Sequence, residues 1–367
     1  MPRDSCPCGC SSMSEVMIPH SRPTVCPDDI RAVAEVMESG RLVQGEQVRA
    51  FEEEMSAFIG GGEAAAVSSG TAALHLALVS LGVGEGDEVI IPGYVCSALL
   101  QAVRHARATP VIADIDPETF NISPQDAGKR LTRKTRAIIV PHMFGLSADL
   151  SGIISLGVPV IEDCAQSLGS RYQGAYTGSA GLLSVFSFYA TKMIATGEGG
   201  MVLSSRADLI GKIRDLRAYD GKAEDRLRYN YKMTDLQAAL GRSQLRKLRQ
   251  FIRRRGEIAG EYNRGLADTG VQLPVTPPGM EHVYYRYVVL MDRSESFMQK
   301  TKAMGVDCRR PVFKPLHEYL NLPGFAVTRG VWERAVSIPV YPSLSDRDVQ
   351  FVIDRVRASL EGGGRRV

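Results

Sequence analysis

The amino-acid sequence predicts an α/β protein with a large domain built on a mostly parallel sheet and a smaller α+β domain at its C-terminal end. Between about residues 63 and 205, short β-rich apolar runs alternate with amphipathic stretches, a pattern typical of a parallel sheet covered by helices on both faces. At 367 residues the chain also exceeds the usual size of one domain. We therefore divide it into a disordered, cysteine-containing tail at 1–16, a large domain at 17–250 and a small domain at 251–367.

The spacing of the apolar residues predicts the individual elements. The expected strands of the large domain are Glu88–Pro92, Pro110–Asp114, Ala137–Val140 and Pro159–Asp163. Its expected helices are Pro27–Gly40, Val48–Ile59, Thr71–Leu81, Ser97–Ala106 and Asp149–Leu156. The remaining expected elements are a long helix after Gly241, a strand at Tyr284–Met291 and a closing helix at Ser345–Leu360.

Charge and hydropathy argue against nucleic-acid and membrane partners. The net charge is only +3, which gives no reason to expect either. Seven basic residues crowd 242–255, but Leu245, Leu248 and Ile252 recur there at helical spacing, so we expect the charges on the solvated face of a packed helix. No apolar run approaches the length that spans a bilayer, and the first residues lack the apolar core of a signal peptide. We expect a cytoplasmic protein.

The cysteines predict reduced thiols. Seven of them are scattered along the chain, which does not resemble a disulfide framework. Cys6, Cys8 and Cys10 lie close together in the tail, but no further pair of ligands follows at the spacing of a zinc site. We therefore expect no metal.

Lys192 is the most informative single residue. It follows the apolar run Val185–Phe188 and precedes the glycine-rich turn Gly197–Gly200. A free lysine amine, with a pKa near ~10.4, becomes a nucleophile at neutral pH only where burial or a neighbouring positive charge lowers that pKa. The apolar, hydroxyl-flanked setting offers such burial. The segment thus predicts a lysine that holds a carbonyl cofactor, with a solvated loop lysine as the alternative.

A second motif has the features of a phosphate site. Ser68–His75 places small residues and hydroxyls where a helix begins, so that free backbone N–H groups and the helix dipole can receive a dianion. Thr71 would add its hydroxyl, and Ser187 could give another. Taken alone, the motif is better explained as an ordinary capped helix start.

A third motif supplies an acid. Asp163 ends an expected strand, where its carboxylate could bind a protonated ring nitrogen, while Glu162 alternates to the opposite face of the sheet. Gln166 follows three residues later and could contact the same ring. A strand-end cap and a generic loop glutamine are the alternatives. The order of phosphate site, acid and lysine is what a pyridoxal phosphate site needs.

At this point the chain resembles the DegT/DnrJ/StrS aminotransferases, which use pyridoxal phosphate in the fold-type-I architecture of aspartate aminotransferase, with its seven-stranded sheet, and mostly act on nucleotide-linked keto-sugars. The resemblance runs nearly end to end. The matching stretches are Ser39–Gly45, Ser69–His75, Asp87–Pro92, His142–Gly145, Glu162–Gln166, Ser187–Gly200, Asn230–Asp235, Gln237–Gly241, Pro315–His317 and Ile338–Pro342.

The resemblance implies roles for the residues of the cofactor site. Lys192 would bind the cofactor covalently and carry protons, Asp163 would pair with the ring nitrogen, and Gln166 would contact the ring. The implied phosphate site is Gly70, Thr71, Ala72 and Ser187.

It also implies a homodimer with shared active sites, because Asn230 corresponds to a residue that reaches the partner's phosphate. Lys314 and His317 fall where the family lines its sugar-nucleotide pocket.

One position departs from the family: where members often stack an aromatic ring on the cofactor, this chain has Cys96. That loses about 1 kcal/mol of stacking unless Tyr94 moves in.

The function implied is transamination. Glutamate or glutamine would donate the amino group, and pyridoxamine phosphate would carry it. A keto-sugar nucleotide would receive it, with a 4-keto-6-deoxy sugar as the first candidate. Lysine at 192 favours aminotransfer over dehydration, because dehydrating family members carry histidine there. An aminotransferase of cyclitol or aminobenzoate biosynthesis is the runner-up, and a non-catalytic regulator is the remote alternative.

Overall fold

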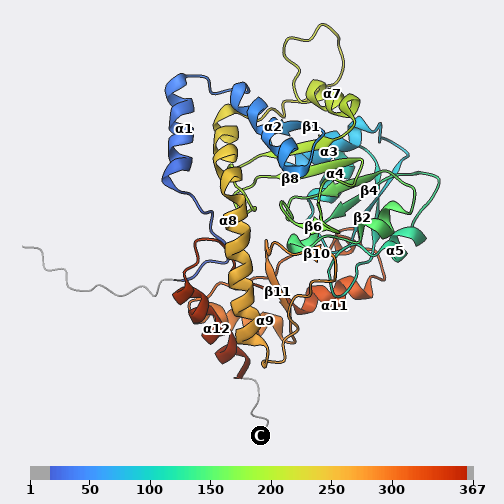
Figure 1. Cartoon of the computed structure of the whole chain (residues 1–367). Coiled ribbons are helices and arrows are strands. Elements are labelled where there is room, and N and C mark those ends of the chain that lie inside the picture. Colours follow the sequence, from blue (N-terminus) through green and yellow to red (C-terminus); the bar gives the residue numbers. More distant parts are fainter. Residues whose placement is uncertain (1–16, 362–367) are drawn as a thin grey trace, which may run out of the picture.

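The computed structural model of this protein describes residues 17–361 (Figure 1). The expected tail, with Cys6, Cys8 and Cys10, lies outside the described residues. A large α/β domain occupies the upper part of Figure 1 and a smaller α+β unit the lower part. No helix within residues 17–361 is long and apolar enough to cross a membrane.

A seven-stranded sheet forms the centre of the large domain, in the order β1-β9-β8-β5-β4-β2-β3. Its strands are β1 (Glu63–Val67), β2 (Glu88–Pro92), β3 (Thr109–Ala113), β4 (Thr135–Pro141), β5 (Val160–Asp163), β8 (Leu183–Ser187) and β9 (Gly200–Ser204). Only β9 runs antiparallel to its neighbours. The prediction of a mostly parallel sheet is confirmed. Because β1, β5 and β8 run in the same direction, their carboxyl ends meet at one edge of the sheet.

Helices cover both faces of this sheet. The helices of the large domain are α1 (Pro27–Ser39), α2 (Glu46–Ile59), α3 (Gly70–Ser80), α4 (Ala98–His105), α5 (Pro124–Lys129), α6 (Leu150–Ile154), α7 (Ala207–Leu216) and a 3-10 turn at Met143–Gly145. Helices α3, α4 and α7 pack with strand residues such as Ala65 and Val185 in one apolar core. On the other face, α2 and α8 (Asp235–Leu266) pack with Ala66 and Phe186.

Helix α3 is the element that positions the site. Its sequence is apolar around the whole circumference and is almost entirely buried, as expected of a helix packed on several sides. It begins at Gly70 because the Ser69 hydroxyl accepts the N–H of Ala72 at 3.1 Å, which caps the first turn.

Helix α8 joins the two domains, and it begins earlier than the sequence predicted. Thr234 and Gln237 form a capping box at its start, a signal that precedes Gly241. Its first part contributes Leu248 to the core of the large domain, and its last part contributes Ile258 to that of the small domain. The division expected near residue 250 therefore falls inside a continuous helix.

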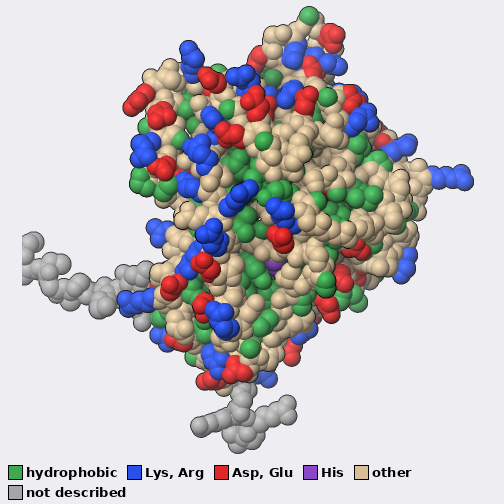
Figure 2. Space-filling view, in the orientation of Figure 1, with side chains coloured by type: hydrophobic (Ala, Val, Ile, Leu, Met, Phe, Trp, Pro, Cys, Tyr) green, Lys and Arg blue, Asp and Glu red, His purple; other side chains and the backbone are tan. Residues whose placement is uncertain are grey.

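The prediction that the basic residues of α8 lie on a solvated face is only partly correct. Arg255 is only 4% exposed, Lys247 pairs with the buried Asp29, and Arg254 pairs with Asp346 at 2.6 Å. Figure 2 shows basic and acidic side chains interspersed over this view of the molecule.

The small domain packs around a two-stranded sheet. Its elements are β11 (Tyr287–Leu290), β12 (Ala335–Ile338), α9 (Ser294–Ala303), α10 (Leu316–Tyr319), α11 (Ala326–Arg334) and α12 (Asp346–Glu361). The expected strand at Tyr284–Met291 is thus shorter at both ends. Ile18, expected in the large domain, bridges to Val306 and packs in the small-domain core. A third small sheet contains β6 (Arg171–Tyr172), β7 (Ala175–Tyr176) and β10 (Met280–Glu281).

Candidate active site

Lys192 lies in a hairpin that joins β8 to β9. The two arms are held by hydrogen bonds from Phe188 N–H to the Gly199 carbonyl at 2.9 Å and from Ala190 N–H to the Gly197 carbonyl at 3.0 Å. Gly197 has φ +82°, which favours glycine at this turn. The lysine side chain is half-buried. The hairpin therefore presents Lys192 from a hydrogen-bonded frame at the carboxyl edge of the sheet.

The predicted phosphate site assembles where α3 meets this hairpin. A Cβ placed on Gly70 would lie 2.8 Å from Cβ of Ser187, and one placed on Gly200 would lie 2.3 Å from the Ser69 carbonyl oxygen. Only glycine fits at these two contacts. The first N–H groups of a helix have no acceptor within the helix, and Ser69 takes up only that of Ala72. The N–H groups of Gly70 and Thr71 are left without an acceptor in the helix, and Gly70 lies against the Ser187 side chain.

Asp163 is a buried carboxyl without a basic partner. It is 6% exposed, its Oδ1 accepts the N–H of Ala165 at 3.0 Å, and it forms no ion pair within residues 17–361. Burial raises its pKa, an effect that the Ala165 N–H and the charge of Lys192 only partly offset. A buried carboxylate needs a counter-charge, which a protonated ring nitrogen would provide.

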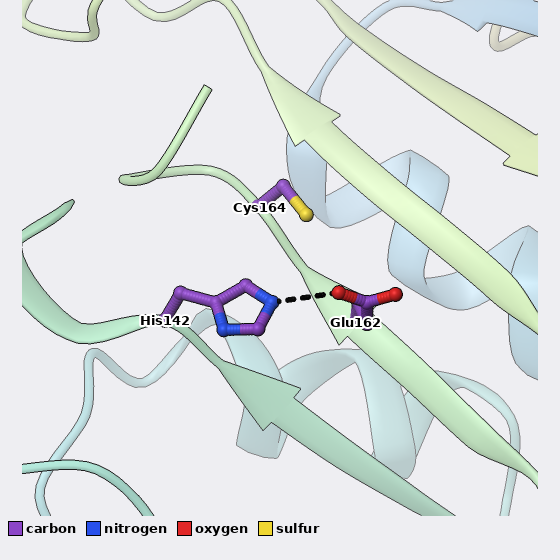
Figure 3. A group of neighbouring side chains, drawn as sticks. All are labelled: His142, Glu162 and Cys164. Atoms are coloured by element: carbon purple, nitrogen blue, oxygen red, sulfur yellow. Dashed lines mark hydrogen bonds and ion pairs between the residues drawn. The ribbon is translucent and has the colours of Figure 1, made fainter. Parts of the chain in front are cut away.

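Glu162 lies on the opposite face, as predicted, and anchors the strand that carries Asp163. Figure 3 shows it with His142 and Cys164. His142 Nδ1 accepts the N–H of Ala148 at 3.0 Å, so its Nε2–H donates to Glu162 at 3.0 Å. Glu162 also accepts the N–H of Gly178 at 2.7 Å and those of Ala180 and Gly181. Burial alone would raise the pKa of Glu162, yet these bonds hold it below its ordinary value.

His142, Glu162 and Cys164 lie close enough to ligate a metal ion, since their ligand atoms are within 4.8 Å of one another. The hydrogen bonds of His142 and Glu162 already satisfy both side chains, so we propose no metal there.

Gln166 follows in the same segment as Glu162 and Asp163, and its Oε1 accepts the N–H of Phe144 at 2.9 Å. This bond fixes the amide and leaves its NH₂ group for another acceptor. Its contact with a ring stays a prediction.

Tyr285 is a site residue that the sequence analysis missed. Lys192 Nζ lies 5.1 Å from the centroid of its ring, within cation–π distance, and its hydroxyl is 3.3 Å from Thr191 Oγ1. Burial would raise the pKa of Tyr285, but the positive charges of Lys192, Arg286 and Arg255, with the hydrogen bond from Thr191, lower it to about 8. The sequence offered one signal, an arginine directly after two tyrosines. The sequence analysis explained these residues only as part of the expected strand Tyr284–Met291.

Cys96 lies near Lys192 and Asp163, whose charges act on its thiol in opposite directions. The side chain is open to solvent, yet the surrounding protein raises the pKa of the thiol. Tyr94 is fully buried and packs edge-on against Phe120 and Phe144. In this arrangement Tyr94 belongs to the core of the large domain. The placement of Cys96 against the face of the cofactor ring stays a prediction.

Asn230 lies on an exposed segment that packs against helix α3. Tyr229 and Tyr231, on either side of it, stack with ring centroids 5.1 Å apart and contact His75 of α3 edge-on. The Asn230 side chain is exposed. The helix of the predicted phosphate site, α3, thus also supports the segment that carries Asn230, whose contact with a partner subunit stays a prediction.

Lys314 and His317 have different environments. Lys314 Nζ lies 4.9 Å from the ring centroid of Tyr319 and is half-buried. His317 is 1% exposed, packs on Phe325, and both its ring nitrogens lack a hydrogen-bond partner. In this arrangement His317 reaches no surface where a substrate could contact it, so its predicted role would need a rearrangement of the neighbouring loop.

The model of the DegT/DnrJ/EryC1/StrS aminotransferase family matches residues 23–357, and the chain belongs to this family. It is 35% identical to the spore coat polysaccharide biosynthesis protein SpsC of Bacillus subtilis, over 94% of this chain and 97% of that one. It is 33% identical to GDP-perosamine synthase of Escherichia coli O157:H7, over 92% and 97% of the two chains.

Solved structures share the fold. The aminotransferase TlmJ from Streptoalloteichus hindustanus superimposes with a TM-score of 0.90 at 33% identity, over 94% of this chain and 99% of that one. The PLP-form of Spr1654 from Streptococcus pneumoniae gives 0.89 at 26% identity, over 94% and 99%. This protein is therefore a pyridoxal-phosphate-dependent aminotransferase. The predicted fold, enzyme class and cofactor are confirmed.

The residues of the site fit this cofactor. The N–H groups of Gly70 and Thr71 with the Ser187 hydroxyl suit its phosphate, in a space that added Cβ atoms would fill. Asp163 lacks the cation that a protonated ring nitrogen supplies, and Lys192 lies near it on the same side of the sheet edge. These individual assignments remain predictions, because the comparisons identify the family and not its contacts in this chain.

The charges around Tyr285 predict an unusual titration. In the cofactor-free protein, one tyrosine should ionise near pH 8, and Tyr285→Phe should remove that step from the phenolate absorbance. The pKa of Tyr285 in the folded protein lies below the ordinary tyrosine value of about 10. The ionised side chain therefore stabilises the folded state fully above pH ~10, and this stabilisation is lost as the pH falls through about 8. A titration in which no tyrosine has a pKa below the ordinary range would contradict the placement of positive charges around Tyr285.

Proposed function

We propose that this enzyme transfers the amino group of glutamate or glutamine to the keto group of a nucleotide-linked sugar, with a 4-keto-6-deoxy sugar as the first candidate. The product would serve the synthesis of amino sugars for polysaccharides, such as lipopolysaccharide, or for secondary metabolites. The names of the relatives, one a GDP-perosamine synthase and one a polysaccharide biosynthesis protein, support this substrate class. The observation that carries the proposal is Lys192 in its rigid hairpin, close to the buried Asp163.

Each residue has a definite task in this chemistry. When bound, pyridoxal phosphate supplies an electron sink for negative charge at the carbon next to the amino group. Asp163 keeps the ring nitrogen protonated, and the N–H groups at the start of α3 hold the phosphate. Lys192 Nζ, once free, removes a proton from the α-carbon of the donor and later returns one to the sugar carbon. Histidine could not be both covalent anchor and proton carrier.

We also propose that the enzyme is a homodimer with shared active sites. Exposed apolar side chains of the large domain support an interface; Val43 is 75% exposed, Leu227 74% and Ile30 64%. Burial of such side chains stabilises association. Asn230 lies three residues after Leu227 and would reach the phosphate of the partner subunit.

The substrate is tested by incubating the enzyme with glutamate or glutamine and a panel of keto-sugar nucleotides, and measuring the mass of the product. We expect an aminated sugar nucleotide with at least one of the panel. Lys192→Ala should reduce turnover by at least a thousand-fold, of the order that a lost anchor and acid–base group implies. Lys212→Ala, at an exposed position on α7, is the matched control and should retain turnover. Amination of a cyclitol ketone alone would contradict the sugar proposal.

Shared sites are tested by mixing two inactive variants. In a hybrid of Lys192→Ala with Asn230→Ala subunits, one site would keep both residues because each comes from a different chain. Activity should therefore return on mixing, toward half of the wild-type value per hybrid dimer, while each variant alone stays weak. If no activity returns although light scattering shows mixed dimers, Asn230 does not act across the interface.

A further inference from the structure

The ring of Tyr285 faces the amine of Lys192 from across the domain boundary. Lys192 lies in the hairpin of the large domain, and Tyr285 lies in the segment before β11. Lys192 Nζ is 5.1 Å from the centroid of the ring, which is within cation–π distance. Within residues 17–361 the amine forms no ion pair and no hydrogen bond. The aromatic face is therefore the partner that the protein offers to the free amine.

The phenol of Tyr285 is tied to the hairpin that carries the amine. Its hydroxyl lies 3.3 Å from Oγ1 of Thr191, the residue directly before Lys192. The Arg286 guanidinium approaches the same phenol, with Nη2 3.5 Å from the hydroxyl oxygen. The side chain is only 7% exposed and belongs to the same apolar cluster as Phe188. The ring therefore has little freedom to leave the amine.

The backbone of Tyr285 is fixed against the turn that contains Phe144. The N–H of Arg286, the next residue, donates to the Phe144 carbonyl at 3.2 Å. A Cβ placed on Gly145 would lie 2.9 Å from the backbone nitrogen of Tyr285, so only glycine permits this approach. Gln166 in turn accepts the N–H of Phe144. The ring is thus held through its backbone as well as through its hydroxyl.

Proton transfer changes the charge that the ring faces. When the amine takes a proton from carbon it becomes an ammonium, and the electron pair of the C–H bond passes to the cofactor. The negative face of an aromatic ring attracts a cation and not a neutral amine. Burial would raise the pKa of Tyr285, but positive charges, that of Lys192 foremost, lower it to about 8. The phenol therefore responds to the charge on this amine.

We propose that Tyr285 is a positioning residue for proton transfer, whose ring holds the free amine of Lys192 and stabilises it once it has taken the proton. The inference rests on the proposed function, in which Lys192 Nζ moves a proton from the donor and later returns one to the sugar carbon. Thr191 orients the phenol, and the ring face holds the amine. Proton transfer thus depends on a residue from outside the large-domain hairpin.

The first experiment measures the half-reaction with the donor alone. Holoenzyme is mixed with glutamate or glutamine without a keto-sugar, and the loss of the cofactor's visible absorbance gives a saturating rate and an apparent Kd. Tyr285→Leu should lower the rate by about 10- to 100-fold, the order that misplacement of a reacting group costs, with the apparent Kd unchanged. Tyr285→Phe keeps the ring and should retain most of the rate. Tyr284→Leu, which removes a ring stacked on His282 instead, is the matched control and should react as wild type.

An isotope effect distinguishes positioning from a general loss of structure. With a donor deuterated at the α-carbon, removal of the deuteron is slower than removal of a proton. Because Tyr285→Leu impairs this transfer, the step should limit the rate more strongly, and the isotope effect on the saturating rate should exceed that of the wild type. Tyr284→Leu should show the wild-type isotope effect.

A third measurement needs neither cofactor nor donor. In the cofactor-free protein, Lys192→Met removes the charge that faces the phenol and keeps a long unbranched side chain. The tyrosine that titrates near pH 8 should then titrate at higher pH, toward the ordinary value of about 10. Lys212→Met, at an exposed position on α7, should leave this titration unchanged. Phenolate absorbance follows both variants.

The outcomes separate this inference from the proposed function. If Tyr285→Leu and Tyr284→Leu react at the same rate, or if the slower rate of Tyr285→Leu carries no larger isotope effect, Tyr285 does not position the amine, although the proposed donor stands. If the wild type responds to neither amino acid, the proposed donor fails. In that case, or if Tyr285→Leu does not fold, the phenol titration decides the inference. A tyrosine that still titrates near pH 8 in Lys192→Met overturns it, because the ring then does not face the amine.

Discussion

The active site depends on one close contact, between the start of α3 and the hairpin that joins β8 to β9. Gly200 lies against the Ser69 carbonyl and Gly70 lies against Ser187, and neither position has room for a Cβ atom. The contact brings together the free N–H groups of α3 and the Ser187 hydroxyl. The same hairpin carries Lys192. The predicted phosphate site at Gly70 and the predicted cofactor lysine, Lys192, come from segments 122 residues apart and are thereby set in one rigid frame.

The neighbouring strand β5 divides its two acids between different tasks. Glu162 is fully satisfied by His142 and three backbone N–H groups, and it fixes the strand end. Asp163, one residue later, faces the other side with no basic partner among the described residues. The buried carboxylate whose hydrogen bonds are already satisfied thus supports Asp163, which we propose as the partner of the cofactor.

The sequence predicted the parts of the fold whose signal is local. Strand β2 and the helices α1, α2, α3, α4 and α6 followed from apolar spacing, whereas α5 and α7 were not predicted. The order of Thr71, Asp163 and Lys192 indicated the cofactor. The start of α8 was placed too late because the Thr234 and Gln237 capping box was not considered. Tyr285 was missed for a different reason. Its importance comes from its approach to Lys192 across the domain boundary, and no spacing along the chain reveals such an approach.

We propose Lys192 as the covalent anchor of pyridoxal phosphate. Reduction of the holoenzyme with borohydride, followed by proteolysis and mass spectrometry, fixes the cofactor to the lysine that it occupies. The structure predicts that the added mass lies on the peptide containing Lys192 and on no other lysine. Recovery of the label at Lys232 or Lys314, with Lys192 unmodified, would contradict the account.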